Sequence, residues 1–148
     1  MDRITIPLIN KPIFSTSLQV RVYDLNYGNH LGHDSLVSLI HEARVQFFKR
    51  YGFTELDIDG IGILITSLVV NYKAEAFYGD NIQIEIGINE ISKTGIDFLY
   101  SLKLQNPCRE IARAMTTVTF FDYKKSKIAR IPNSFLEAIK DFNDCPSK

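Results

Sequence analysis

The sequence predicts an α+β fold in which one long amphipathic helix packs on an antiparallel sheet. Two patterns carry this prediction. Apolar residues recur at three- and four-residue steps over about residues 34–51, the period of a helix face. Four later segments run apolar or alternate, with turn residues between them, as the strands of an antiparallel meander do. A helix of ~18 residues is about 27 Å long, so a curved sheet can cover its apolar face.

Residues that favour the beginning and the end of a helix flank the apolar stripe. Asp34 is a favoured residue type for the N-cap, and Gly52 suits the end of the helix. Residues 24–33 are polar and contain glycines, which predicts a loop, and residues 14–23 predict a first strand before it. The buried positions of the helix should be the members of its stripe: Leu36, Leu39, Ile40, Ala43, Phe47 and Tyr51.

The strands of the meander differ in character. Residues 63–72 are nearly all apolar, which predicts a strand that is covered on both faces or lies at an interface. Residues 82–88 and 96–104 alternate cleanly, and 111–121 is the last strand. We expect a single domain over residues 1–148, with its core at about 15–135 and a short C-terminal helix at about 133–143.

Composition narrows the function classes. Lys+Arg 17 balance Asp+Glu 17, which argues against a general nucleic-acid or acidic-membrane binder. Cys108 and Cys145 form no C-x-x-C pair, so a disulfide framework or cysteine zinc site is not expected. No signal peptide and no stretch of about 20 apolar residues is present, so we expect a cytoplasmic protein.

Three segments resemble the motifs of a known family. The segment from Arg21 to His33 reads R-V-Y-D-L-N-Y-G-N-H-L-G-H, and the helix then carries H-E-A-R at residues 41–44. The first resembles the pattern R-[FY]-x-D-x-D-x-x-G-H-V-N-N, and the second E-E-A-R. Asn71-Tyr72-Lys73 and Tyr78-Gly79-Asp80 are similar to Y-K-x-P-x-x-Y-G-D. The chain therefore resembles the hotdog-fold thioesterases of the 4-hydroxybenzoyl-CoA thioesterase-like group over about residues 15–135.

The resemblance implies a hotdog fold, a five-stranded antiparallel sheet wrapped around one long central helix. It also implies a homodimer or homotetramer with sites at the subunit interface. Independently, the apolar stretch 63–70 is a candidate interface strand. Relatives hydrolyse thioesters of coenzyme A or of acyl carriers, so an acyl-CoA or acyl-carrier thioester is the expected partner. No cofactor is expected, since coenzyme A is part of the substrate.

The match fails at one important position. Asn26 stands where the family has its usual catalytic aspartate, and an amide cannot serve as a general base near neutral pH. Asn26 can still orient a water or the thioester carbonyl. The resemblance offers His30 and Glu42 as proton acceptors, and Asp34 lies nearby. The backbone N–H of His33 matches the family's oxyanion donor, at a helix N-terminus that favours negative charge.

These side chains also have structural interpretations. Asn26 could hold an Asx-turn, and His30 could brace the loop or pack at the interface. Glu42 could be a solvated helix-face carboxylate paired with Gln46 or Lys49, and Asp34 suits a helix cap better than a base. Asp24 is interpreted as structural. The cations considered for the phosphates of coenzyme A are Lys73, Lys93 and Arg130.

A metal site is not expected, because the three histidines, His30, His33 and His41, match no metal motif. The hypotheses are then three. The first is an acyl-CoA thioesterase-like hydrolase that cleaves an acyl or aroyl thioester with water. The second is a non-hydrolytic hotdog protein that binds an acyl thioester, a class that the amide at Asn26 would suit. The third is a hotdog 3-hydroxyacyl dehydratase, although the local motif of those enzymes differs from this loop.

Overall fold

The computed structural model describes residues 3–143. Its elements in chain order are β1 (Phe14–Gln19), the 3-10 turn η1 (Val22–Asp24), α1 (His33–Arg50), β2 (Gly62–Tyr72), β3 (Asn81–Ile91), β4 (Gly95–Gln105), β5 (Cys108–Asp122), β6 (Lys127–Ile128) and α2 (Asn133–Asn143). Cys145 and the two ends of the expected domain lie outside the described residues. The helices expected at about 34–51 and 133–143 are both present, as α1 and α2.

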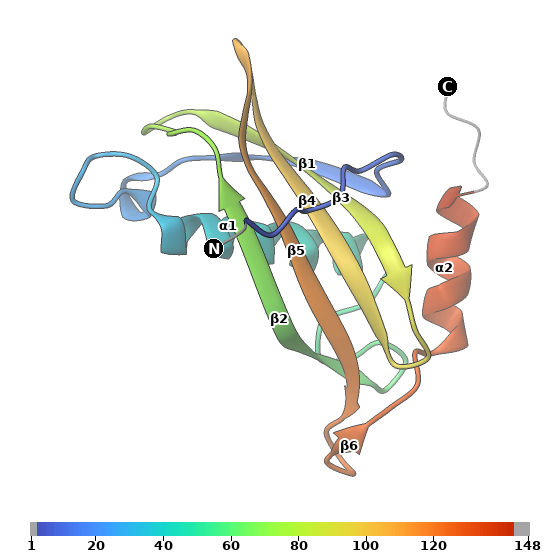
Figure 1. Ribbon diagram of the computed structural model, residues 1–148. Coiled ribbons are helices and arrows are strands. Elements are labelled where there is room, and N and C mark those ends of the chain that lie inside the picture. Colours follow the sequence, from blue (N-terminus) through green and yellow to red (C-terminus); the bar gives the residue numbers. More distant parts are fainter. Residues whose placement is uncertain (1–2, 144–148) are drawn as a thin grey trace.

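The strands form an antiparallel sheet in the order β1-β3-β4-β5-β2 (Figure 1). The predicted α+β class is thereby confirmed. The sheet has six strands instead of the expected five, because β6 turns back on β5 and pairs Phe121 with Ile128 and Asp122 with Lys127. A strand of two residues is too short to show a hydrophobic period, so the sequence pattern could not reveal it.

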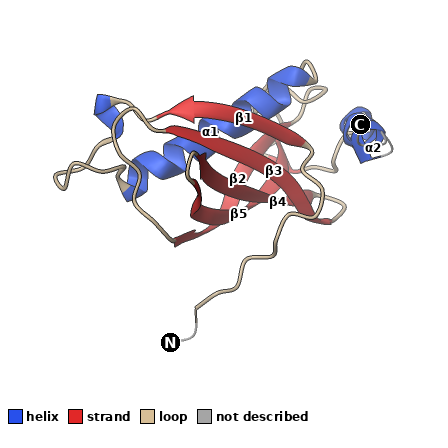
Figure 2. Cartoon of the chain, turned by 90° about the horizontal axis from the view of Figure 1, so that it is seen from above, coloured by secondary structure: helices blue, strands red, loops and turns tan. Residues whose placement is uncertain are grey.

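Helix α1 lies against one face of the sheet, and the N-terminal segment crosses the opposite face (Figures 1 and 2). The predicted stripe is buried at all its positions except Tyr51, which is half-buried. It meets the alternating inward-facing side chains of the strands, among them Ile84 and Leu102, which lie opposite each other on β3 and β4. The two periods, helical and extended, thus supply the two halves of one core.

An aromatic cluster fixes both helices to the sheet. Phe47 and Phe48 of α1 pack on Phe98 of β4, with ring centroids 5.6 and 6.3 Å apart. Phe135 of α2 packs on Phe48 and on Phe120 of β5, at 5.5 and 5.8 Å. Fully buried aromatic rings of this size dominate core energetics. The cluster therefore orients α1, and with it the position of the helix start.

Two predicted boundaries move by a few residues, and both lie next to the loop. The first strand ends at Gln19 instead of residue 23, because the backbone N–H of Arg21 donates to the carboxylate of Asp24 at 2.8 Å and closes η1. Asp24 is buried, at 4% exposure, which agrees with its predicted structural role. The N-cap of α1 is Gly32 and not Asp34, which lies inside the first turn.

Strand β2 occupies the edge of the sheet beyond β5. The expectation that it is covered on both faces is wrong for the single chain, since Leu64, Ile65 and Leu68 are exposed. A register shift between Ile65 and Ser67 marks an irregularity in its pairing with β5. The strand is apolar yet uncovered, which is the combination that the alternative prediction, an interface strand, requires.

Candidate functional site

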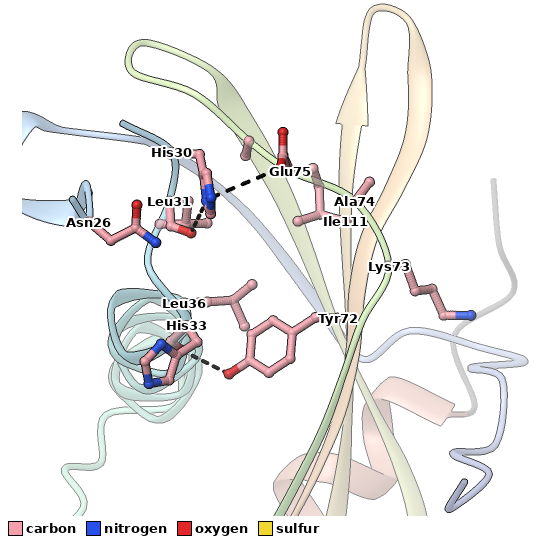
Figure 3. Close-up of a pocket in the computed structure, with 11 residues that line it drawn as sticks. Asn26, His30, Leu31, His33, Leu36, Tyr72, Lys73, Ala74, Glu75 and Ile111 are labelled. Carbon is pink, nitrogen blue, oxygen red and sulfur yellow. Dashed lines mark hydrogen bonds and ion pairs between the residues drawn. The ribbon is translucent and has the colours of Figure 1, made fainter. Parts of the chain in front are cut away.

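A cavity of about 380 Å³ opens where the loop before α1 faces the end of β2 (Figure 3). Its volume lies in the usual range for small-molecule sites. The lining comes from the loop and first turn of α1, from the end of β2 and the residues after it, and from β5. The members are Asn26, His30, Leu31, His33, Leu36, Tyr72, Lys73, Ala74, Glu75, Ala76 and Ile111. Three of the predicted site residues, Asn26, His30 and His33, are therefore brought together.

Asn26 forms the Asx-turn that its structural interpretation predicts. Its side-chain Oδ1 accepts the N–H of Gly28 at 2.9 Å, and its backbone N–H donates to the carbonyl of His30 at 2.9 Å. A Cβ at Gly28 would lie 3.3 Å from that Oδ1 and 3.2 Å from the ring Nε2 of His30, so a larger residue there would have to displace both side chains slightly. With its oxygen engaged, Asn26 keeps its amide N–H groups for a ligand.

His30 lines the cavity with its imidazole ring. The Nδ1 atom lies 3.3 Å from the carbonyl oxygen of Leu31, and a proton on Nδ1 would complete a hydrogen bond there. The Nε2 atom then carries the lone pair, and it lies on the side of Glu75, with 4.0 Å between Nε2 and the carboxylate oxygen Oε1 (Figure 3). His30 is thus held by the backbone and presents one nitrogen to the cavity.

The first turn of α1 supplies the second polar feature. The first intrahelical hydrogen bond runs from Leu36 N–H to Gly32 C=O, so the preceding amides, including that of His33, have no acceptor within the helix. The cap makes no side-chain hydrogen bond either. Free N–H groups and the positive end of the helix dipole favour a negatively charged oxygen at this place.

Tyr72 ties β2 to the helix start. Its hydroxyl donates to the carbonyl of His33 at 2.9 Å, across the floor of the cavity (Figure 3). Burial raises the pKa of Tyr72 above its usual value, and the carboxylate of Asp34 raises it further. The phenol therefore stays protonated and remains a donor at neutral pH. Asp34 itself is not among the residues that line the cavity.

Glu75 is the residue that sequence reasoning missed. It is the one carboxylate among the described residues that line this cavity. The sequence did contain a signal for it. When the pattern Y-K-x-P-x-x-Y-G-D is aligned from Tyr72, Glu75 stands at the position of the proline. The chain thus has an amide where the family has an acid, and an acid where the family has a proline.

Glu42 lies elsewhere in the single chain. It lines a second pocket with Asp24 and Arg21, and its Oε1 accepts a hydrogen bond from Gln46 at 2.9 Å. This is one of the pairings that its structural interpretation anticipated. The cavity beside His30 therefore receives no carboxylate from α1 within one protomer.

Of the three predicted cations, only Lys73 reaches the cavity wall. Its ammonium group lies 3.9 Å from Glu110, and Figure 3 shows the side chain directed away from His30. Lys93 and Arg130 lie at the other end of the sheet, where the carbonyl of Lys93 accepts the N–H of Ile131. About eight residues of β5 separate the two ends, roughly 27 Å.

Metal-ligating side chains do not gather in the described part of the chain. No group of three or more His, Cys, Asp or Glu residues is found among residues 3–143 that could hold an ion. His41 pairs with Glu55 at 3.0 Å and lies apart from the cavity of His30. Among the same residues, no helix has the length and apolar character needed to cross a membrane.

Comparison with known proteins finds relatives named as an esterase and a thioesterase, and one solved with CoA. The chain is 25% identical over 125 residues to an Aquifex aeolicus protein named "Putative esterase", covering 83% of this chain and 94% of that protein. The structure is similar to Slr0204, a 1,4-dihydroxy-2-naphthoyl-CoA thioesterase from Synechocystis, with a TM-score of 0.81, 18% identity, and 89% and 98% of the two chains covered. It also matches SAV2348 from Staphylococcus aureus, solved in complex with CoA, with a TM-score of 0.81, 12% identity, and 97% and 92% covered.

The family assignment rests on sequence as well as fold. A model of the thioesterase-like superfamily matches residues 20–139, which include the loop, α1 and all six strands except the first. The family resemblance seen in the sequence motifs is confirmed by this match. The chain belongs to the thioesterase-like superfamily, whose solved relatives include hotdog-fold thioesterases.

Proposed function

We propose that this protein is a thioester hydrolase that cleaves an acyl or aroyl thioester with water. One observation carries the proposal: His30, Asn26 and His33, the first residue of α1, line one cavity. A thioester carbonyl placed there would meet an oxyanion donor in the N–H of His33. The relatives named as thioesterases support the same reaction class.

The proposed chemistry divides the roles. Asn26 orients the reactants through its amide N–H groups, and the N–H of His33 receives the oxyanion. Of the two proton acceptors that the motifs offer, His30 lines the cavity, whereas Glu42 could reach it only from a second subunit. Losing one oxyanion donor typically costs about 10²–10³ in rate, so the helix start should carry a large share of the barrier reduction.

We further propose that the substrate is a coenzyme A or acyl-carrier thioester. The structural relative solved with CoA supports a CoA-type ligand. Lys73 is the cation at the cavity wall and is the proposed contact for a phosphate. Lys93 and Arg130, at the far end of the sheet, could share this role only from another protomer.

A homodimer joined through β2 is part of the proposal. The edge of β2 offers unpaired backbone groups, and Leu64, Ile65 and Leu68 are exposed beside it. The strand ends at Tyr72 and the chain continues into Lys73 and Glu75, all of which line the cavity, so a partner on this edge would border the cavity. Light scattering after size exclusion should give twice the chain mass, and Leu68→Lys should shift the protein toward monomer. A monomeric wild-type protein would contradict the dimer.

The decisive experiment measures thiol release from a panel of acyl-CoA and aroyl-CoA thioesters. The wild-type protein should release free thiol, and His30→Ala should slow this release without lowering the melting temperature. Acyl-CoA that raises the melting temperature with no thiol released would instead indicate the non-hydrolytic binder. Hydration of a 2-enoyl thioester would indicate the dehydratase. Release of thiol from none of the panel would refute the hydrolase.

A further inference from the structure

The cavity contains a carboxylate whose position in the chain is unexpected. Glu75 follows β2 and lies across the cavity from His30, with Oε1 4.0 Å from Nε2 (Figure 3). Its side chain is 64% exposed and that of His30 is 33% exposed. The pair therefore remains open to a substrate, unlike a buried structural ion pair.

The backbone at Glu75 is held from both sides. Arg109 donates a hydrogen bond to the carbonyl of Glu75 at 2.6 Å, and the N–H of Leu31 donates to the carbonyl of Ala76 at 2.8 Å. The second bond joins this segment directly to the loop that carries His30. Two neighbouring anchors of this kind fix where the Glu75 side chain leaves the main chain, although the side chain itself is exposed.

The separation of the two groups suits a shared water. A gap of 4.0 Å is too long for a direct hydrogen bond, but a water between the two atoms can bond to both. A neutral imidazole with its proton on Nδ1 offers one lone pair at Nε2, whereas a carboxylate offers several acceptor sites. The two groups can therefore accept the two hydrogens of one water.

The other nearby acids are less suited. Asp24 is buried and accepts from Arg21, Glu42 lines a different pocket, and Asp34 does not line the cavity. Asn26, where the resembled family has its acid, is an amide. Glu75 is thus the acid that the folded chain brings to His30.

We propose that Glu75, and not His30, is the general base of this protein, replacing the carboxylate that is absent at Asn26, and that His30 orients the same water by accepting its second hydrogen at Nε2; this inference rests on the proposed hydrolase function. Glu75 takes one proton from the water while the water oxygen forms the new bond to the thioester carbonyl carbon. The carbonyl π electrons move to oxygen, beside the N–H of His33. When the C=O bond re-forms, the C–S bond breaks with its pair on sulfur. The proton on Glu75 passes to that sulfur, giving a carboxylic acid and a free thiol.

The test is a rescue experiment. Glu75→Gln keeps the size of the side chain and removes the base, so kcat for thiol release should fall about 10²-fold or more, with KM little changed. Asn26→Asp can keep the bond to Gly28 N–H and restores an acid on the loop. The double variant Asn26→Asp/Glu75→Gln should recover at least about tenfold over Glu75→Gln. The matched control is Glu90→Gln, the same substitution at an exposed glutamate that does not line the cavity.

The outcomes separate this inference from the function on which it rests. A Glu75→Gln variant as active as Glu90→Gln, in a wild type that hydrolyses thioesters, overturns the role of Glu75 alone. If the double variant shows no rescue, the role of Glu75 as general base is also refuted. The same holds if Glu75→Gln no longer binds a non-hydrolysable acyl-CoA thioether, because Glu75 would then serve binding or structure instead of proton transfer. A wild type that hydrolyses no thioester refutes the hydrolase, and the base with it.

Discussion

Two polar clusters contact α1, and they differ in whether their polar groups all have hydrogen-bond partners within the protein. Near the middle of the helix, Arg44 donates to Glu55 at 2.6 Å and to the hydroxyl of Tyr100 at 3.3 Å, and Tyr100 bonds to Thr116 at 2.9 Å. Arg44, Tyr100 and Thr116 are each 5% exposed or less. At the helix start, His30, Asn26 and His33 line an open cavity instead.

We expect this difference to separate residues that stabilise the fold from residues that take part in the proposed chemistry. A buried polar group costs free energy unless it is hydrogen-bonded, so the Arg44 cluster stabilises the fold only while all of its hydrogen bonds are made. The cavity groups meet the solvent and can keep donors and acceptors for a ligand. Both clusters come from the same motif region, since Arg44 belongs to the H-E-A-R segment and His30 to the loop before it. We therefore expect the two adjacent motifs to serve different tasks, one in stability and one in the proposed chemistry.

The largest effect should follow from breaking the buried network. Arg44→Ala removes the partner of Glu55 and Tyr100, and we expect the free energy of unfolding to fall by about 3–5 kcal/mol. Urea denaturation followed by circular dichroism measures this. Thiol release per folded molecule should change much less. A loss of activity without a loss of stability would remove the distinction between the two clusters.

The reverse effect is expected at the cavity. His30→Ala should lower kcat/KM for thioester hydrolysis about 10²-fold, equivalent to about 2.7 kcal/mol of transition-state stabilisation. The free energy of unfolding should stay within about 0.5 kcal/mol, as for other half-exposed side chains. The same denaturation curves and a thiol-release assay provide both numbers. Asn26→Ala should act in the same direction on rate.

Tyr72 lies between the two cases, because it both holds the fold and borders the cavity. Tyr72→Phe removes the hydrogen bond to the carbonyl of His33, which should cost about 1 kcal/mol of stability. We expect thiol release to fall as well, by about tenfold, since a shift of the helix start misplaces the oxyanion donor. Tyr78→Phe, a matched change at an exposed tyrosine outside the cavity lining, should alter neither quantity.

The smallest effect concerns alkaline pH. Burial raises the pKa of Tyr100, and Arg44 only partly offsets this. As the pH rises past the ordinary tyrosine value of about 10, the unfolded chain loses this proton before the folded chain does. The folded state then binds more protons, so the free energy of unfolding should decrease as the pH increases.

Tyr100→Phe should make this decrease shallower between pH 9 and 11, measured by urea denaturation at each pH. A residual slope is expected, since burial also raises the pKa of Tyr51 and Tyr72. An unchanged slope in the variant would show that the Tyr100 hydroxyl is not protected by its buried network.

Local pattern accounts for much of the fold. The three- and four-residue spacing of α1 and the alternation of Ile82, Ile84 and Ile86 were both visible in the sequence, and these residues are buried. Boundaries that depend on a single side-chain bond were missed: β1 stops where Asp24 closes a turn on Arg21. The expected helix end is confirmed, because Gly52 adopts a φ of +80° just beyond α1, a conformation that favours glycine.

The sequence by itself determined the α+β class, the helix, most of the strands, and the group of Asn26, His30 and His33 that a shared loop keeps together. Only the tertiary structure decided which acids accompany them. Glu42 and His30 lie 12 positions apart yet line different pockets, whereas Glu75 lies 45 positions from His30 and within 4.0 Å of it. The physical reason is that hydrophobic periods specify which face of an element is buried, while contacts between polar groups of different elements follow from how those faces pack together.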